Sequence, residues 1–361
     1  MLKKFISLLV FYLVLSCLVF AQEIAPPKLE PKPTTEKHDA LIRDGIALHD
    51  KGNFDGAIAK YQEVLTENSE DVLALYELGY SYFAKSDYKK SLEIAYKGTQ
   101  YKSKYLVGFY VLIGNNLDNL NESEKAIKVY QSGLKLYPDN QLLHFNLAVT
   151  LLRLNKTDEG KKSLKNAMMA DPNYRSSHYL LAQLYHKENY KIPAILAICR
   201  FLVVEPDSPR SASALQGLLS LLSEGATKGK DNQINIVINT DSKNDEGDFG
   251  ALQGALAIMS AAKHLDESKK KSEVQLWVES LTLLLSLMDE AKDGKKQPGF
   301  AWNYYRPYFI EIRKRNFTEP FAYFILQSKQ SPEVQKWLVQ NYQKVNEFLA
   351  WSKSYQWYNG K

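Results

Sequence analysis

The chain has 361 residues and carries 46 lysines and arginines against 41 aspartates and glutamates, a formal net charge of +5. This length exceeds what one hydrophobic core usually serves, so we expect two structural units. Without Lys3 and Lys4, which lie in a segment expected to be removed, the balance is 44 to 41, or +3. A balance so close to neutral argues against a strongly charged nucleic-acid surface.

Residues 1–21 predict a secretory signal peptide, because two lysines precede an uncharged run from Phe5 to Phe20, and small Ala21 follows it. The mature protein is then exported, and is periplasmic or extracellular depending on the number of membranes. Two alternatives stay open. The apolar run is near the lower length limit of a membrane-spanning helix and could be retained as an anchor. Cys17 sits in a weak lipoprotein signal, whose lipidation would tether the protein to a membrane.

Residues 22–37 contain four prolines among charged residues and predict an extended, solvated tether. After cleavage of the signal peptide Cys199 is the remaining cysteine, which excludes an internal disulfide. Its neighbours follow an apolar helical pattern, so we expect a buried, unreactive thiol.

A pattern of small, aromatic and aliphatic residues recurs through the first half of the chain. The central small residues of its five copies are Ala57, Ser91, Ala126, Gly160 and Ala194, at steps of 34, 35, 34 and 34. Twelve positions earlier the copies carry Gly45, Gly79, Gly114, Ala148 and Ala182, and the last three copies close on Pro138, Pro172 and Pro206. Small residues in both series allow two antiparallel helices to approach closely, and proline ends a helix. Each copy therefore predicts a helix, a turn and a second helix.

These columns resemble the tetratricopeptide repeat family, whose unit of 34 residues has this order of small, aromatic and proline positions. The resemblance covers about residues 38–208; Gly160 and Ala95 depart from the usual alanine and aromatic residue. It implies an all-α solenoid of helical hairpins. Gly217 follows Ala182 by 35 residues, so the segment 210–224 is expected to be a capping helix that completes a solenoid at 38–224.

The resemblance also implies that the first helices line a groove that holds a segment of a partner protein. By repeat position, the groove residues are Tyr76, Tyr80, Phe83, Asn115, Phe145, Asn146, Tyr179, Gln183 and His186. Aromatic and amide side chains suit an apolar or amphipathic protein segment better than a nucleic-acid backbone. The alternative for each aromatic residue is packing against the next repeat.

Two histidines, His144 and His178, share one repeat position. Two lone histidines without a third ligand do not make a metal site, and we predict neither metal nor cofactor.

Residues 225–248 read as a linker in which Ile234, Ile236 and Ile238 alternate with other residues like a short half-buried strand. The sequence offers no evident second strand. We therefore expect this segment to lie extended along the helices or to pair with another chain.

Residues 249–361 predict a second, smaller helical domain that resembles no family. Ser331 and Pro332 should open one helix that carries apolar residues from Val334 to Leu349. Four of the five tryptophans lie in the last sixty residues: Trp302, Trp337, Trp351 and Trp357. Helical spacing favours a domain core for these aromatic residues; the alternative is an aromatic platform for a sugar or peptide.

No GxSxG, HExxH or GxxxxGK[ST] pattern occurs, so we do not expect an enzyme. The sequence predicts an exported scaffold or adaptor for protein partners in the cell envelope. One alternative is a carbohydrate- or envelope-polymer-binding protein that uses residues 249–361. A further alternative is a self-assembling homo-oligomer joined through residues 234–239 or through the repeat ends.

Overall fold

The fold is taken from a computed structural model, which describes residues 24–228, 233–237, 245–262, 270–290 and 299–358. The predicted signal peptide and Cys17 lie outside these ranges. Within them, none of the helices combines the length and the apolar character that crossing a membrane requires. The chain divides into two units, residues 1–163 and 164–361, and each is described by itself.

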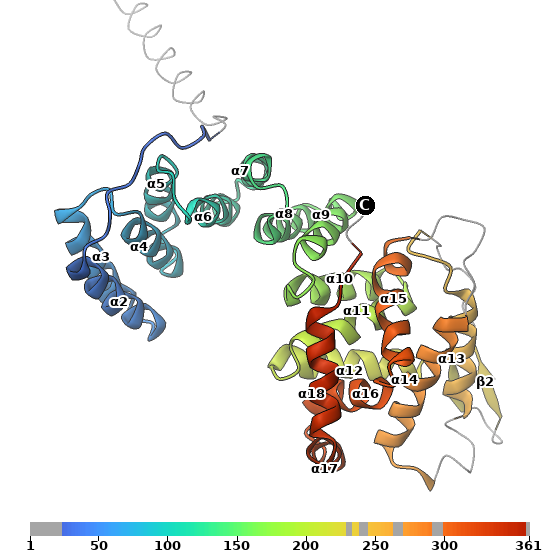
Figure 1. Cartoon of the computed structure of the whole chain (residues 1–361). Coiled ribbons are helices and arrows are strands. Elements are labelled where there is room, and N and C mark those ends of the chain that lie inside the picture. Colours follow the sequence, from blue (N-terminus) through green and yellow to red (C-terminus); the bar gives the residue numbers. More distant parts are fainter. Residues whose placement is uncertain (1–23, 229–232, 238–244, 263–269, 291–298, 359–361) are drawn as a thin grey trace, which may run out of the picture. The chain divides into compact units, whose positions relative to one another are not determined.

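Unit 1 consists of helical hairpins that follow one another in chain order (Figure 1). Its helices are α2 (Glu36–Asp50), α3 (Phe54–Glu67), α4 (Val72–Ala84), α5 (Tyr88–Gly98), α6 (Leu106–Asn119), α7 (Ser123–Leu136) and α8 (Gln141–Arg153), and α9 (Thr157–Ala170) crosses the division between the units. The predicted alternation of first and second helices is confirmed in every copy of the repeat.

The turn inside each hairpin depends on one residue with left-handed backbone conformation. These residues form a column of their own in the repeat: Gly52, Ser86, Asn121, Asn155 and Asn189, with φ between 60° and 77°. Glycine has no Cβ to clash there, and asparagine tolerates this region better than most residues. Ser86 is the residue of this column least suited to its conformation.

Side chains cap several of the helix starts. Asn53, Asp71, Asp87 and Asn140 each accept a hydrogen bond from a backbone N–H in the first turn of the helix that follows. Such caps satisfy amides that have no partner within the helix. The hairpins are therefore delimited by local sequence.

The small residues of the first helices face large residues of the second helices. A Cβ at Gly45 would lie 2.4 Å from the Tyr61 ring, and one at Gly114 would lie 2.2 Å from the Tyr130 ring. Both tyrosines are fully buried. In the second copy Ser91 donates a hydrogen bond of 2.7 Å to the carbonyl oxygen of Gly79 instead. The predicted close helix contact is thus made by glycine under tyrosine, or by a hydroxyl.

The tether is attached to unit 1 by backbone hydrogen bonds. Leu29 and Tyr101 form a parallel bridge, in which the amide of Leu29 donates to Gln100 at 3.0 Å and the amide of Lys102 donates to Leu29 at 2.8 Å. The described part of the tether is extended, as expected, and lies against the loop after α5.

Unit 2 contains the fifth hairpin, the capping helix and the helices that follow (Figure 1). Its elements are α10 (Arg175–Lys187), α11 (Lys191–Val204), α12 (Pro209–Ser223), β1 (Ala226–Lys228), β2 (Ile234–Ile236), α13 (Gly250–Ala262), α14 (Glu273–Glu290), α15 (Phe300–Lys314), α16 (Thr318–Ile325), the 3₁₀ turn η3 (Gln327–Lys329), α17 (Pro332–Gln340) and α18 (Tyr342–Ser354).

Helix α11 explains why the fifth repeat belongs with the C-terminal helices. Its residues from Ile192 to Val203 are all buried, because α10, α12, α13, α15 and α16 all pack against this helix. A helix that is apolar all round requires burial on every face. The unit boundary therefore falls within α9, and not at residues 225–248, where the composition changes.

Glu246, at the end of the predicted linker, is buried among three helices of unit 2. Its carboxylate forms an ion pair with Lys165 of α9, accepts a hydrogen bond of 2.8 Å from the hydroxyl of Tyr185, and accepts another of 3.2 Å from the amide of Ala301. This end of the linker is an integral part of the core of unit 2.

The expectation for the isoleucine strand is wrong. Ile234–Ile236 pairs within the chain, antiparallel to Ala226–Lys228, with Ala226 opposite Ile236. The partner strand has only three residues and no apolar alternation, so it carries no recognisable strand pattern. Ile238 lies outside the described residues.

The prediction of one helix from Pro332 to Leu349 is also wrong, because two helices form there. Helix α17 ends at Gln340, and α18 starts at Tyr342. Pro332 opens α17 as expected, but the Ser331 side chain makes no capping hydrogen bond. Apolar periodicity continues across the break and therefore hid it.

Candidate functional site

Three predicted groove residues of unit 1 lie together on α4. The ring of Tyr80 lies 5.9 Å from that of Tyr76 and 6.4 Å from that of Phe83, measured between centroids, and 6.1 Å from that of His49. Tyr80 is 45% exposed. We call these four residues the aromatic row; it extends from the first repeat to the second.

Tyr76 connects this row to the third repeat. It packs on Tyr105 and Phe109 of the next repeat, with centroids at 5.6 and 5.5 Å. Burial raises the pKa of Tyr76 to about 12. This residue therefore serves repeat packing, the alternative considered for it, while Tyr80 faces solvent.

The other predicted residues of unit 1 lie on α6 and α8. The side-chain oxygen of Asn115 accepts a hydrogen bond of 2.7 Å from the hydroxyl of Tyr130, and the side-chain nitrogen of Asn146 donates to the carbonyl of Leu142 at 2.8 Å. Phe145 is half-buried. Both amides thus have roles within their own hairpins.

The three predicted residues of unit 2 line one cavity of about 210 Å³. Tyr179, Gln183 and His186 come from α10, where Gln183 and His186 are exposed and Tyr179 is half-buried. Apolar and small residues of three helices complete the wall: Ala182, Ile198, Phe201, Ser213, Ala214, Gly217 and Leu221. We call this space the α10–α12 cavity.

Two small features of the repeat help to leave this space open. Ile198 occupies the column in which the first and third copies have Tyr61 and Tyr130. Gly217 occupies the glycine column, but a Cβ built there meets no atom within 4 Å. In the first and third repeats a tyrosine of the second helix covers that position, whereas no second helix directly follows α12. The cavity therefore lies where the repeat pattern is incomplete.

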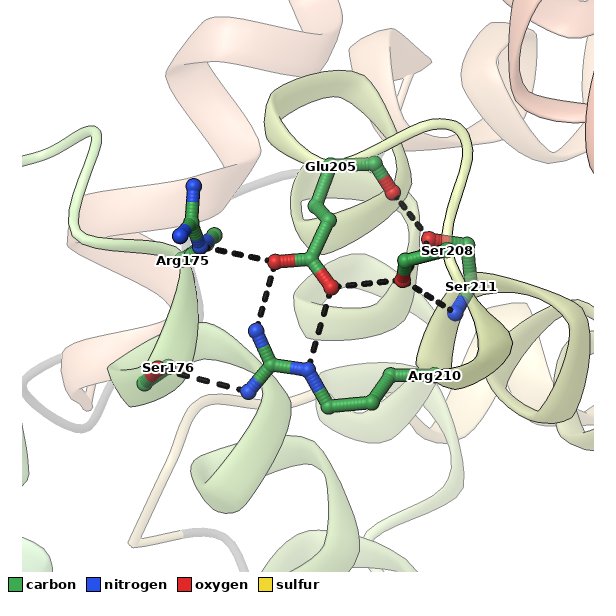
Figure 2. A network of polar contacts seen from close by, with 6 residues as sticks. All are labelled: Arg175, Ser176, Glu205, Ser208, Arg210 and Ser211. Carbon is green, nitrogen blue, oxygen red and sulfur yellow. Dashed lines mark hydrogen bonds and ion pairs between the residues drawn. The ribbon is translucent and has the colours of Figure 1, made fainter. Parts of the chain in front are cut away.

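A polar network at the start of α12, shown in Figure 2, lies next to two residues of the cavity wall. Arg210 donates to both carboxylate oxygens of Glu205, at 3.0 and 2.5 Å, and Arg175 contacts the same carboxylate at 2.8 Å. The guanidinium of Arg210 also lies 5.5 Å from the ring centroid of Tyr179 and 5.7 Å from that of Phe201. The network thus holds two rings of the cavity wall in place.

The charge of Glu205 is stabilised by this network. Burial by itself raises the pKa of its carboxyl group, but hydrogen bonds from Arg210 and Ser208 and the charges of Arg210 and Arg175 outweigh burial and lower it. Ser208 also caps α12, because its hydroxyl accepts the amide of Ser211 at 3.1 Å. The carboxylate therefore stays ionised at neutral pH and joins α10, α11 and α12.

Sequence reasoning missed the wall residues of the cavity on α11 and α12, among them Phe201 and Leu221. These side chains follow the ordinary apolar pattern of a core helix, so pattern alone assigns them to packing. The signal that could have indicated these wall residues is Gly217. It occupies the repeat position of Gly45 and Gly114, but no second helix of a repeat follows it in the sequence.

The two histidines in register serve the fold. His144 contacts the carbonyl oxygen of Pro138 at 2.8 Å, and His178 contacts that of Pro172 at 3.0 Å, six residues earlier in both cases. His178 also contacts the hydroxyl of Tyr305 at 2.9 Å. Over the part of the chain that the structure describes, no three histidine, cysteine or acidic side chains gather as a metal ion would require.

The C-terminal aromatic residues pack mainly on one another. Trp302 is 3% exposed, Trp337 stacks on Tyr323 with centroids 4.1 Å apart, and Trp351 stacks on Tyr308 at 5.2 Å. Trp302 thus lies in the core, whereas Trp337, Trp351 and Trp357 are half-buried. Cys199 is buried, as expected, and burial raises the pKa of its thiol.

Comparison with known families matches two parts of the chain. The family profile described as TPR repeat matches residues 45–86, and that described as Tetratricopeptide repeat matches residues 121–189.

Similar proteins share the repeat region. TPR repeat-containing protein YpiA of Bacillus subtilis (strain 168) is 24% identical over 179 residues, which are 47% of this chain and 42% of that protein. Protein O-mannosyl-transferase TMTC1 of Homo sapiens is 25% identical over 138 residues, 38% of this chain and 15% of that protein. The chain thus spans less than half the length of either relative. The solved structure of TTC0263, a thermophilic TPR protein of Thermus thermophilus, matches 51% of this chain and 98% of its own, with 20% identity and a TM-score of 0.43.

Proposed function

From the premise that residues 45–189 carry tetratricopeptide repeats, we propose that this protein is a non-enzymatic scaffold that binds a segment of a partner protein in the α10–α12 cavity. One observation carries the proposal. The three residues that repeat position assigns to the groove in this unit, Tyr179, Gln183 and His186, line a single cavity. Stacked repeats present such surfaces to extended protein segments.

The walls define the chemistry of the bound segment. Ile198, Phe201 and Leu221 are apolar, so they suit an aliphatic or aromatic side chain that inserts over Gly217. Full burial of one such side chain contributes about 1.5–3 kcal/mol. Gln183 and His186 at the exposed edge offer hydrogen-bond donors and acceptors for the backbone of the segment. The bound segment is therefore anchored by one apolar residue and positioned by polar contacts.

We also propose that the protein works in the cell envelope. The support is the lysine pair and apolar run of residues 1–21. Mass spectrometry of the protein purified from its own cells tests this: a mature chain that begins at Gln22 is expected. A lipid-modified Cys17 would instead indicate tethering, and an intact Met1 in a cytoplasmic fraction would contradict export.

The docking proposal is tested with Gly217→Leu, which fills the cavity, and Gly217→Ala as its matched control. Neither substitution meets a steric obstacle near the backbone, since the added Cβ finds open space. Baits of residues 22–361 capture partners from envelope extract, and each captured protein is then purified and its affinity measured by calorimetry. We expect Gly217→Leu to weaken binding at least about tenfold, the equivalent of one lost apolar anchor. Gly217→Ala should retain most of it.

A third bait separates the two units. Tyr80→Ala combined with Phe145→Ala removes rings of unit 1 and leaves the cavity intact. If this bait loses a partner that Gly217→Leu keeps, the binding site is on unit 1. If neither bait changes the affinity of any purified partner, the groove proposal is wrong.

A further inference from the structure

Unit 1 has a second groove, on a different surface from the predicted groove residues. It has a volume of about 370 Å³ and is formed by α5, the end of α6, α7 and Ile24 of the tether. Its apolar floor consists of Leu92, Tyr96, Leu117, Leu120 and Val129 of these helices, and Ile24 of the tether packs against it at one side. Leu117 and Val129 belong to the buried core of the unit, and Leu92 and Tyr96 pack against that core. The core of unit 1 is therefore accessible from this side, between second helices, whereas the predicted groove residues lie on first helices.

Four lysines surround this floor: Lys89, Lys125, Lys128 and Lys135. The single acidic residue of the lining, Glu122, forms an ion pair with Lys125 at 2.6 Å. The lining therefore has a net charge of four minus one, or +3. We call this site the lysine groove.

Two of these lysines form no ion pair within the part of the chain that the structure describes. Lys89 and Lys128 are exposed, and among the described residues neither has a carboxylate within 4.0 Å. Glu124, four residues before Lys128, pairs instead with Lys156 at 2.8 Å. A groove whose apolar floor is half-buried or buried, and whose rim carries charges of one sign without an ion-pair partner, suits an oppositely charged partner.

We propose that the lysine groove binds an acidic amphipathic helix of a partner protein. An apolar stripe at i, i+3, i+4 and i+7 matches the floor, and glutamates or aspartates beside the stripe match Lys89 and Lys128. Charge complementarity determines which amphipathic helices bind, because a basic helix would place like charges together. The floor supplies the apolar contact, and the lysines supply orientation and selectivity.

The geometry favours a helix lying between α5 and α7. Leu92 and Tyr96 are four residues apart on α5 and point into the groove from one wall, and Val129 of α7 contributes from the other. A third helix placed in this space would pack on both, as the helices of the repeats pack on their neighbours. The lysine groove thus extends the helix packing of unit 1 by one partner helix.

The test measures binding of a synthetic probe to residues 22–361 by fluorescence anisotropy. The probe is a labelled peptide of about 16 residues, long enough to form a helix on docking, with leucines along one face and glutamates beside them. Two comparison peptides are a charge-reversed version, with lysine for each glutamate, and a scrambled version of the same composition. We expect the acidic peptide to bind saturably and the two comparison peptides not to do so. NaCl should lower the affinity for the acidic peptide, because the lysines are exposed and salt screens their charge.

Matched variants locate the binding. The double substitution Lys89→Glu with Lys128→Glu should lower the affinity for the acidic peptide about tenfold. Leu120→Gln, at the groove floor, should also lower this affinity. Lys51→Glu with Lys162→Glu changes the net charge equally at exposed lysines outside the groove, and should change affinity less than about twofold. Circular dichroism confirms that each variant is folded. Gly217→Leu should leave the affinity unchanged, which separates this site from the α10–α12 cavity.

The proposal is overturned by any of three results. The first is no saturable binding of the acidic peptide. The second is that the scrambled peptide binds as tightly as the acidic peptide, or that the Lys51 and Lys162 substitutions lower the affinity as much as those at Lys89 and Lys128. Either outcome would show general charge attraction. The third is that anionic phosphatidylglycerol vesicles, but not the peptide, bind in a manner that depends on Lys89 and Lys128, which would make the groove a lipid site.

Discussion

The guanidinium of Arg200 lies 4.8 Å from the ring centroid of Trp357, and this contact joins the fifth repeat to the last described segment of the chain. Arg200 is 1% exposed. Its terminal nitrogens donate to Asn173 at 2.7 Å and to Ser352 at 3.0 Å. Trp357 stacks on Tyr308 with centroids 4.7 Å apart. A buried cation is thus held by aromatic faces and neutral acceptors.

Loss of the Trp357 ring should destabilise unit 2. We expect Trp357→Ala to lower the free energy of unfolding by about 2 kcal/mol, because apolar contact and a partly desolvated cation–π interaction are lost together. Chemical denaturation followed by circular dichroism measures this. Tyr358→Ala is the control; Tyr358 is 41% exposed, and its removal should cost less than about 0.5 kcal/mol. Equal effects of the two substitutions would contradict the assigned role of Trp357.

Unit 2 should lose stability in mild acid. Burial, and secondly the charge of Arg200, lower the pKa of His178 to about 3, from the ordinary 6.5. Between these two values the unfolded chain binds a proton that the folded chain excludes, so stability is fully present above pH 6.5 and falls as the pH decreases towards 3. From pH 7 to pH 5 this histidine alone should remove about 2 kcal/mol.

Two variants test the assignment to His178. Denaturation at pH 5 and pH 7 should show a smaller difference for His178→Gln, which has no titrating ring. Tyr305→Phe removes the hydroxyl that contacts the ring at 2.9 Å but keeps the buried imidazole, so the pH difference should persist. A pH difference that is the same in His178→Gln and in the unsubstituted chain would show that other groups cause it.

The glycine column should respond to alanine according to what covers it. Gly114→Ala places a Cβ 2.2 Å from the buried Tyr130 ring, and overpacking of this kind costs about 1–3 kcal/mol. Gly217→Ala meets open space and should instead stabilise α12 by about 0.5–1 kcal/mol, through the higher helix propensity of alanine. Denaturation midpoints compare the two. A loss of stability in both would mean that the space over Gly217 is filled in solution.

The turn column makes the opposite kind of prediction at Ser86. This residue has a φ of 63°, and the matching residue of the next repeat is Asn121, also at 63°. Asparagine populates the left-handed region more readily than serine. Ser86→Asn should therefore stabilise unit 1 by about 0.5 kcal/mol, and Asn121→Ser should destabilise it by a similar amount. Shifts of the same sign at the two positions would refute the turn argument.

Long-range partners set the limit of what could be predicted. The repeat register, the cavity residues on α10 and the burial of Cys199 follow from spacing. The pairing of Ile236 with Ala226, the break at Asn341 and the docking of Trp357 on Arg200 do not. Apolar periodicity shows that a helix face is covered, but it does not identify the element that covers it.

The sequence by itself determined the hairpins of this protein, because the contacts of Gly45 with Tyr61 and of Gly114 with Tyr130 and the left-handed turn residues all act within single hairpins, and these recur about every 34 residues. Only the tertiary structure decided where the pattern stops. The apolar surface of α11 packs both on α10 and α12 and on the C-terminal helices α13, α15 and α16, and no side chain covers Gly217 on α12. Burial depends on all the surfaces that meet in space, and such surfaces come from parts of the chain that no repeat relates.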